Sequence, residues 1–414
     1  MILKGMRWWI VGLICLGTIV NYLSRNTLGV LAPVMMSEMH FTTAEYSYVV
    51  GAFQIAYTIM QPVCGFILDT LGVRAGFAMF AGLWSMVSWL HVVAAGWISL
   101  ALFRGLLGLT EAAAIPAGVK AIAEWFPARQ RSQGMGLFNI GTSVGAMLAP
   151  PMVVALQQRF GWHSAFLATG GLGFVFAGLW WTLYRSPARH PFIGEDELAM
   201  IEAGQTDQPA RAQRASVPAI LSTRRFWGVA LPRFLAEPAW QTFTFWIPLY
   251  LTSVRGMDLK EMAMFAWLPF LAADLGSLVG GFLPPLLMRK FGMKLVNSRL
   301  TGVCIGSVLM IAPGCVGLAG NPHLAIALFC IGGFAHQIIS ALINTLAVDM
   351  FGRHEIGTAS GLAGMAAWSG GLGFSLLVGA LADSIGYNPL FACLSVFDLI
   401  GAGIAVLLLS RSSK

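Results

Sequence analysis

Residues 98–126, ISLALFRGLLGLTEAAAIPAGVKAIAEWF, form an apolar stretch of membrane-span length that contains two charged side chains, Arg104 and Glu111. Residues seven apart return to the same face of an α-helix about 10.5 Å further along its axis, so the guanidinium and the carboxylate share one stripe. A charge in hydrocarbon costs roughly 2.5–3.5 kcal/mol on insertion scales, and such residues usually face the protein interior or a watery cavity. The stretch therefore predicts a membrane helix with a functional pair, and the alternative is a buried ion pair that only packs helices.

The composition of the whole chain extends this prediction to the complete protein. Of its 414 residues, 57% are hydrophobic and 10% are charged, whereas soluble domains carry about 25% charged residues. A membrane helix needs about 20 apolar residues, and twelve runs meet that requirement. They cover residues 8–33, 44–68, 75–95, 97–125, 132–157, 163–184, 226–252, 261–288, 296–318, 323–349, 357–382 and 389–409. The sequence predicts an all-α integral membrane protein with twelve transmembrane helices.

The basic residues predict the orientation of these helices. With the N-terminus in the cytoplasm, most of the 25 Lys and Arg residues fall in inner loops, as the positive-inside rule requires. Both termini are thus predicted to be cytoplasmic, and the net charge of +7 gives no reason to expect a nucleic-acid partner. The first apolar run is long and carries Arg25, so no cleavable signal peptide is expected. The six cysteines show no metal-ligand spacing, and we expect no metal.

A charged and polar segment divides the predicted helices into two groups of six. The predicted organisation is an N-terminal half at 1–184, a cytoplasmic linker at 185–223 and a C-terminal half at 224–414. An offset of 225 residues aligns the two halves weakly. It matches Glu124-Trp125-Phe126 with Asp349-Met350-Phe351, Gly136 with Gly361, and Glu111 with His336. Polar centres at matching positions of two repeats are expected when a binding site lies at the membrane midplane of a transporter.

The predicted turn between the second and third helices, GFILDTLGVR at 65–74, contains a specific pattern of small, acidic and basic residues. Gly65, Asp69, Gly72 and Arg74 resemble the signature of the major facilitator superfamily in this turn. The resemblance implies a fold of twelve helices in two six-helix halves, and it implies that these four residues form a gating motif on the cytoplasmic side. The alternative is a tight turn without a gating role.

Arg25 lies in a predicted span within NYLSRNTLG at 21–29, at a depth similar to that of Arg104. Glu111 can compensate only one of the two guanidinium groups, which favours an anionic ligand for the other. Arginine presents a planar fork that binds a carboxylate in a bidentate manner. We therefore interpret Arg25 as an anion anchor, and a structural pairing role is the alternative.

Seven segments together narrow the resemblance to the anion:cation symporter branch, and within it to bacterial hexuronate transporters. These segments are NYLSRNTLG, YTIMQPVCGFILDTLG, RGLLGLTEAAAIPAG, EWFPARQRS, FWGVALPRFLAEPAW, AMFAWLPFLAADLGS and IGGFAHQIIS. The resemblance implies proton-coupled uptake of D-galacturonate or D-glucuronate by alternating access, with protons as the coupling ion and no cofactor.

The resemblance also implies roles for single residues. It assigns the substrate carboxylate to Arg25 and proton coupling to Arg104 and Glu111. Further substrate contacts carry over to four residues, Tyr22, Tyr57, Trp368 and Ser369. One position departs from many relatives, because Ser24 stands where they carry an Asp. This departure leaves the proton-to-substrate ratio open.

Other substrate-binding candidates rest on their position in the predicted helices alone. They are Asn139, Thr142, Trp240, Gln241, Gln337 and Asn344, and polar packing between helices is the alternative for several of them. His336 on an apolar face is interpreted as a packing residue more readily than as a site residue. We expect Asp349 to be a gate residue at the cytoplasmic end, and Lys120 and Arg233 to extend toward the inner surface.

Several alternatives to hexuronate uptake remain at this point. They are symport of another organic anion such as an aldonate or a small carboxylate, an efflux antiporter, and a sensor that does not transport. An enzyme is not expected, because no nucleophile and base pair or phosphate-cradling loop occurs. The expected setting is the bacterial inner membrane, where the chain crosses the lipid bilayer as a monomer and binds a sugar-acid anion and protons.

Overall fold

The computed structural model describes residues 5–41, 43–203, 216–247, 250–251, 254–257, 265, 267–352 and 355–410. Within these residues, all regular secondary structure is helical. Eleven helices in the described part of the chain are long and apolar enough to cross a membrane. The predicted all-α membrane architecture is therefore confirmed, while the cytoplasmic position of both termini stays a prediction.

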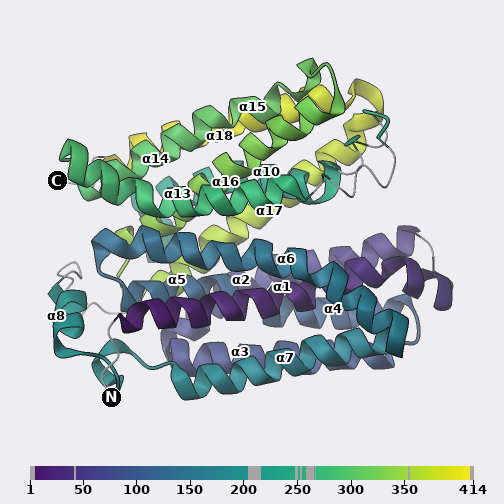
Figure 1. Cartoon of the computed structure of the whole chain (residues 1–414), viewed down its shortest axis with the longest axis horizontal. Coiled ribbons are helices and arrows are strands. Elements are labelled where there is room, and N and C mark those ends of the chain that lie inside the picture. Colours follow the sequence, from purple (N-terminus) through teal and green to yellow (C-terminus); the bar gives the residue numbers. More distant parts are fainter. Residues whose placement is uncertain are drawn as a thin grey trace. The chain divides into compact units, whose positions relative to one another are not determined.

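The first half of the chain contains seven long helical segments, shown in Figure 1. They are α1 (Met6–Glu38), α2 (Thr43–Leu71), α3 (Val73–Leu90), α4 (Trp97–Glu111), α5 (Ala114–Trp125), α6 (Arg131–Phe160) and α7 (Trp162–Leu183). The predicted span at 97–125 is interrupted between α4 and α5, directly after Glu111. Pro116 explains the interruption, because proline has no N–H to donate to the carbonyl group four residues earlier.

The second half begins with short helices in the predicted linker, α8 (Glu195–Ala203) and α9 (Val217–Leu221). Residues 204–215 of that linker lie outside the described residues. The long helices that follow are α10 (Arg224–Gln241), which runs into η4 (Thr242–Trp246), then α13 (Leu268–Phe291), α14 (Leu295–Leu309), α16 (Pro322–Met350), α17 (Ile356–Ile385) and α18 (Tyr387–Leu409). A short helix, α15 (Ile311–Gly314), follows α14.

Two predicted spans differ in part from the observed helices. The span predicted at 226–252 corresponds to α10 and η4, and it is the one not counted among the eleven apolar helices. Its helix carries Arg233 and Glu237, and residues 248–249 and 252 at its end lie outside the described part. The span predicted at 261–288 is described as a continuous helix only from Leu268 onward.

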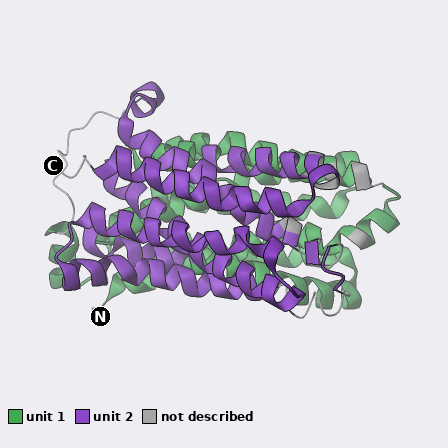
Figure 2. Cartoon of the chain, turned by 90° about the horizontal axis from the view of Figure 1, so that it is seen from above, with its two compact units in different colours: residues 1–127, 140–212, 353–365 green, residues 128–139, 213–352, 366–414 purple. Residues whose placement is uncertain are grey.

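The helices group into two compact units, coloured separately in Figure 2. Unit 1 contains residues 1–127, 140–212 and 353–365, and unit 2 contains residues 128–139, 213–352 and 366–414. In unit 1, α2 packs on α4 and α3 packs on α7. In unit 2, α13 packs on α16 and α10 packs on α18.

The two units differ from the two predicted sequence halves by one reciprocal exchange. Residues 128–139 pack in unit 2, and residues 353–365 pack in unit 1. These segments correspond to each other at the predicted repeat offset, because the second begins 225 residues after the first. The predicted boundaries at 1–184, 185–223 and 224–414 follow the sequence repeat. As domain boundaries they stay a prediction.

Two glycines that the repeat aligns explain how these exchanged segments fit. A Cβ atom on Gly136 would lie 2.5 Å from the carbonyl oxygen of Ser277 in unit 2. A Cβ atom on Gly361 would lie 2.4 Å from the carbonyl oxygen of Gln61 in unit 1. Both helices approach a neighbouring backbone too closely for any side chain. The repeat therefore retains glycine at a position where close packing requires it.

Candidate functional site

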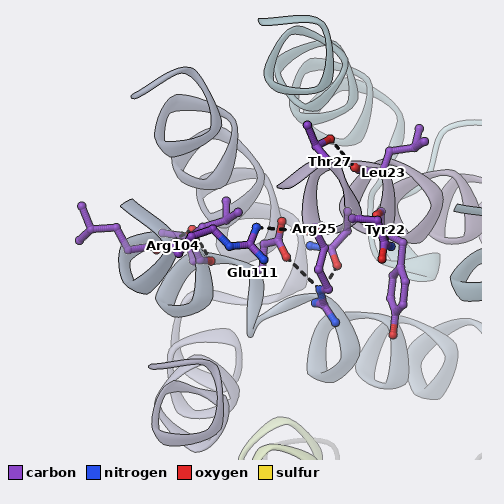
Figure 3. Close-up of polar contacts among 11 residues, drawn as sticks. Tyr22, Leu23, Arg25, Thr27, Arg104 and Glu111 are labelled. Carbon is purple, nitrogen blue, oxygen red and sulfur yellow. Dashed lines mark hydrogen bonds and ion pairs between the residues drawn. The ribbon is translucent and has the colours of Figure 1, made fainter. Parts of the chain in front are cut away.

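Arg25 on α1 and Glu111 at the end of α4 form an ion pair in unit 1 (Figure 3). The Arg25 Nε donates a hydrogen bond to Glu111 Oε2 at 3.1 Å. A second donor of the same guanidinium, Nη2, bonds to Asn21 Oδ1 at 3.1 Å. The Glu111 side chain is fully buried and that of Arg25 is 11% exposed. The predicted anion anchor is thus bound to the predicted proton-coupling carboxylate.

Arg104 contacts the main chain of Arg25 and does not form the ion pair with Glu111 that its helical stripe suggested. Its Nη1 donates to the Arg25 carbonyl oxygen at 3.2 Å. No ion pair of Arg104 with any residue of the described part is present. Residues seven apart are separated by about 10.5 Å along a straight helix, whereas α1 brings its own guanidinium directly to the carboxylate. The prediction that Arg104 and Glu111 act as a functional pair in proton coupling stays a prediction.

Three aromatic rings surround these guanidinium groups. The rings of Tyr22 and Tyr57 each lie 4.6 Å from the Arg25 guanidinium carbon. The centroid of the Phe53 ring lies 5.4 Å from the guanidinium carbon of Arg25 and 4.7 Å from the guanidinium carbon of Arg104. Cation–π contacts of this kind stabilise a guanidinium where water is scarce. Tyr22 and Tyr57 were predicted as site residues, whereas Phe53 was missed although it precedes Tyr57 by one helical turn.

Glycines on α4 and α6 allow the site helices to approach one another. A Cβ atom on Gly108 of α4 would lie 2.5 Å from the Phe53 carbonyl oxygen on α2. A Cβ atom on Gly145 of α6 would lie 2.6 Å from the Tyr22 Cβ on α1. The aromatic rings reach the guanidinium groups because these two positions carry no side chain. Thr142, a predicted site residue in the same part of α6, is buried in unit 1.

Asp69 of the predicted gating motif caps the beginning of α17 within unit 1. Its carboxylate accepts hydrogen bonds from the Gly357 N–H at 3.1 Å, the Thr358 N–H at 2.7 Å and the Thr358 hydroxyl at 2.8 Å. The Lys120 Nζ donates to the same carboxylate at 2.6 Å. An anion at a helix N-terminus is favoured by the exposed N–H groups and by the helix dipole. Lys120 is buried and its ammonium group binds the turn at Asp69, and its predicted extension toward the inner surface stays a prediction.

The other members of the gating motif have separate positions. Gly65 packs against the backbone of Gly357, where a Cβ atom would collide with the carbonyl oxygen. Gly72 precedes α3 with φ of 80°, a conformation that glycine adopts without strain. Arg74 donates from Nε and Nη2 to the Trp181 carbonyl oxygen at 3.0 and 2.7 Å. Their gating role stays a prediction.

Unit 2 contains a set of neutral polar side chains that were predicted from position. The Asn139 Nδ2 donates to Gln337 Oε1 at 3.4 Å, and Asn344 is buried on the same helix as Gln337. Gln241 on α10 is buried and packs against Gly371 on α17. A Cβ atom added to Gly371 would lie 2.6 Å from the Cγ of Gln241. The remaining predicted residues of this unit are Trp240, which is partly exposed on α10, and Trp368 and Ser369 on α17.

Asp349 at the end of α16 holds two arginine side chains in unit 2. Arg131 Nη1 donates to its Oδ1 at 3.1 Å, and Arg299 forms a second ion pair with the same carboxylate. Arg299 also donates to the Ala128 carbonyl oxygen. Arg131 and Ala128 belong to the exchanged segment 128–139, so Asp349 anchors that segment. Its predicted gate role stays a prediction.

Helices of membrane-span length with buried charges on several of them define a class of protein, the multi-span membrane protein with a polar functional interior. The Major Facilitator Superfamily model matches residues 14–375. The chain belongs to the Major Facilitator Superfamily, as its turn motif predicted. Its relatives and its fold are those of transporters and not of enzymes.

Individual relatives are similar over nearly the whole chain. The hexuronate transporter of Escherichia coli (strain K12) is 51% identical over 402 residues, which cover 97% of this chain and 93% of that protein. The galacturonate transporter of Dickeya chrysanthemi is 47% identical over 327 residues, which cover 78% and 95%. A crystal structure of the superfamily transporter FucP in the outward conformation covers 98% of each chain with a TM-score of 0.74 at 13% identity. The predicted resemblance to hexuronate transporters is confirmed at the level of sequence similarity.

Proposed function

We propose that this protein is a proton-coupled symporter that takes up a hexuronate, such as D-galacturonate or D-glucuronate, by alternating access. The names of the relatives that share 51% and 47% identity with it support this substrate class. The proposed setting is the bacterial inner membrane, in which a monomer acts with protons as the coupling ion and without a cofactor.

The observation that carries the proposal is the buried ion pair between Arg25 and Glu111 at 3.1 Å. Two guanidinium groups and one carboxylate meet there, so the site has an excess of positive charge that suits an anion. Removing one partner of a buried ion pair costs about 3–5 kcal/mol because the other charge is left uncompensated. Protonation of Glu111 removes that partner, and the substrate carboxylate then replaces it on Arg25.

Proton binding and substrate binding are coupled through the charge of the Arg25 guanidinium. Protonation of Glu111 removes the carboxylate that compensates this charge, and the substrate carboxylate restores the compensation. A neutral Glu111 leaves Arg25 available to a carboxylate. When the proton leaves on the inner side, the Glu111 carboxylate competes for Arg25 and releases the substrate. Arg104 can keep its contact whether Glu111 is protonated or ionised. Its hydrogen bond is to the main-chain oxygen of Arg25 and not to the carboxylate of Glu111 or of the substrate.

Neutral side chains are proposed to hold the sugar hydroxyl groups. In unit 1 these are Tyr22, Tyr57 and Thr142, and in unit 2 they are Asn139, Trp240, Gln241, Gln337, Asn344, Trp368 and Ser369. Amide and hydroxyl groups pair with hydroxyl groups without the desolvation cost that a buried charge carries. Gly65, Asp69, Gly72 and Arg74 are proposed to gate the cytoplasmic side.

The test measures uptake of labelled galacturonate into proteoliposomes with and without an inward proton gradient. The wild type is expected to accumulate galacturonate only with the gradient. Glu111→Gln is expected to lose gradient-driven accumulation and to retain counterflow exchange, since an amide mimics the protonated carboxyl group. Arg25→Ala is expected to lose both. Glu197→Gln is the matched control, because Glu197 lies on α8, outside the candidate spans, and pairs with Arg7 at 2.7 Å.

Two results would contradict the proposal. Equal loss of accumulation and exchange in Glu111→Gln, with an intact fold, would remove its role in proton coupling. No uptake of any hexuronate by the wild type would overturn the substrate class, and competition by aldonates or small carboxylates would then identify the alternative anion.

A further inference from the structure

His336 on α16 is held in one orientation by aromatic rings of unit 2. The Trp240 ring lies nearly parallel to the imidazole, with centroids 5.6 Å apart and an angle of 19°. The Phe243 ring approaches it edge-on at 6.4 Å and 86°. Phe270 packs edge-on against Trp240 at 5.6 Å and 89°, so the indole is itself fixed. The imidazole is 5% exposed and has little freedom to rotate.

The Nδ1 atom of His336 differs in its hydrogen bonding from the Nδ1 atom of His91, another buried histidine. The His336 Nδ1 is buried and has no hydrogen-bond partner among the described residues. The Nδ1 of His91 bonds to the Val87 carbonyl oxygen at 2.9 Å, while its Nε2 is buried without a partner among the described residues. A neutral imidazole offers one donor and one acceptor, and an unpaired buried polar group is costly. A packing role alone does not explain why this Nδ1 is buried without a partner.

The surroundings of His336 indicate which ligand chemistry fits. Further along the same helix, Gln337 bonds to Asn139 and the Asn344 Oδ1 is buried without a partner among the described residues, and the Arg233 guanidinium on α10 acts electrostatically on His336. One face of the Trp240 ring is covered by His336, and the indole is partly exposed. Neutral donors and acceptors beside an aromatic ring suit a polyhydroxylated ring.

We propose that His336 is a specificity-determining residue that hydrogen-bonds a hydroxyl group of the sugar acid, with Trp240 and Phe243 holding its ring in place. This inference rests on the proposed function and adds to it the group that distinguishes one hexuronate from another. A site built to hydrogen-bond a hydroxyl group rejects a ligand that does not present one, because the polar group of the site is then left unpaired. Epimers that differ in the direction of one hydroxyl group are therefore the appropriate probes.

The test uses competition for labelled galacturonate binding in proteoliposomes by galacturonate, by its C4 epimer glucuronate, and by mannuronate, which is the C2 epimer of glucuronate. His336→Phe retains an aromatic ring for the stack on Trp240 and removes both nitrogens. We expect its affinity for the best-bound hexuronate to fall at least about tenfold and the spread of affinities across the three epimers to narrow at least about threefold. His336→Gln retains a hydrogen-bond donor and an acceptor. It is expected to keep more of the affinity and more of the spread of affinities than His336→Phe does.

His91→Phe is the matched control, because His91 is buried in unit 1 and stacks on Phe166 at 4.8 Å and 13°. His91→Phe is expected to change the thermal stability of the protein without changing the spread of affinities across the three hexuronates. Should His336→Phe fail to fold, His336→Gln still tests the proposal by its own epimer profile.

Three results would overturn the inference. The first is an unchanged profile in His336→Phe and His336→Gln. The second is equal affinity of the wild type for all three epimers. The third is a narrowing in His91→Phe as large as that in His336→Phe. If the wild type binds no hexuronate, the proposed function fails together with this inference. If it binds hexuronates with an unchanged variant profile, only this inference fails.

Discussion

At the residue scale, the contacts of Arg25 explain how a guanidinium is held within a membrane span. A carboxylate, an amide oxygen and two tyrosine rings contact it directly. Each of these groups offsets part of the cost of removing the charge from water. Spacing along a single helix predicts two of them, since Asn21 and Tyr22 lie about one turn before Arg25. The other two come from α2 and α4.

Phe53 provides a prediction at the same scale, because its ring contacts both guanidinium groups. Phe53→Leu retains an apolar side chain and loses two cation–π contacts, each worth about 0.5–2 kcal/mol. We expect the KM for galacturonate uptake to rise at least about fivefold, because two contacts at the lower limit sum to about 1 kcal/mol and about 1.4 kcal/mol corresponds to tenfold.

Phe77→Leu serves as the control for Phe53→Leu. Phe77 packs on Trp84, Phe176 and Trp180 and contacts no guanidinium group in the described residues. It is expected to lower stability and to leave KM unchanged. Equal effects of the two substitutions on KM would assign the Phe53 effect to packing alone.

At the scale of elements, backbone features decide how helices meet around the site. Pro116 separates α4 from α5 directly after Glu111, and Gly108 allows α2 to approach α4. Both features are visible in the sequence, but neither predicts which helix becomes the neighbour. A glycine in a span indicates a close approach without identifying the partner.

Gly361 and Gly82 form a matched pair that tests close approach. Alanine in a helix interior is favoured over glycine by about 0.5–1 kcal/mol, and no atom lies within 4 Å of a Cβ atom added to Gly82. Gly82→Ala is expected to leave the unfolding temperature in detergent unchanged or raised. Gly361→Ala is expected to lower it, because its Cβ would meet the Gln61 backbone and overpacking costs about 1–3 kcal/mol. A higher unfolding temperature in Gly361→Ala would disprove the close approach.

At the scale of the whole molecule, each compact unit contains a segment from the other sequence half. Unit 1 includes residues 353–365, and Asp69 binds Gly357 and Thr358 within it. Unit 2 includes residues 128–139, and Asp349 binds Arg131 within it. The sequence repeat is therefore not a division into two independent bundles.

Separate expression of residues 1–203 and 216–414 tests this exchange. The first fragment lacks Gly357 and Thr358, and hydrogen bonds to a charged group contribute about 1.5–3 kcal/mol each. We expect this fragment alone to unfold at a lower temperature in detergent than the co-expressed pair, and galacturonate binding to appear only in the pair. An unfolding temperature of the fragment equal to that of the full chain would show that the exchanged segment contributes no stability.

The sequence alone determined the class of protein. Only helices or closed barrels satisfy their backbone hydrogen bonds in hydrocarbon, so apolar runs of about 20 residues predict helices. The turn motif and the repeat then predicted the superfamily, and charged residues within spans predicted where the site lies. These signals are local, which is why one sequence is sufficient to find them.

Only the tertiary structure decided which charges meet. The helical stripe favoured Arg104 as the partner of Glu111, yet the carboxylate pairs with Arg25, which lies 86 residues away in the sequence. Lys120 pairs with Asp69, and His336 stacks on Trp240. Helical periodicity determines which face of a helix a residue occupies. The partner of that face depends on how separate helices pack, because a charge within a membrane interacts with the nearest opposite charge in space.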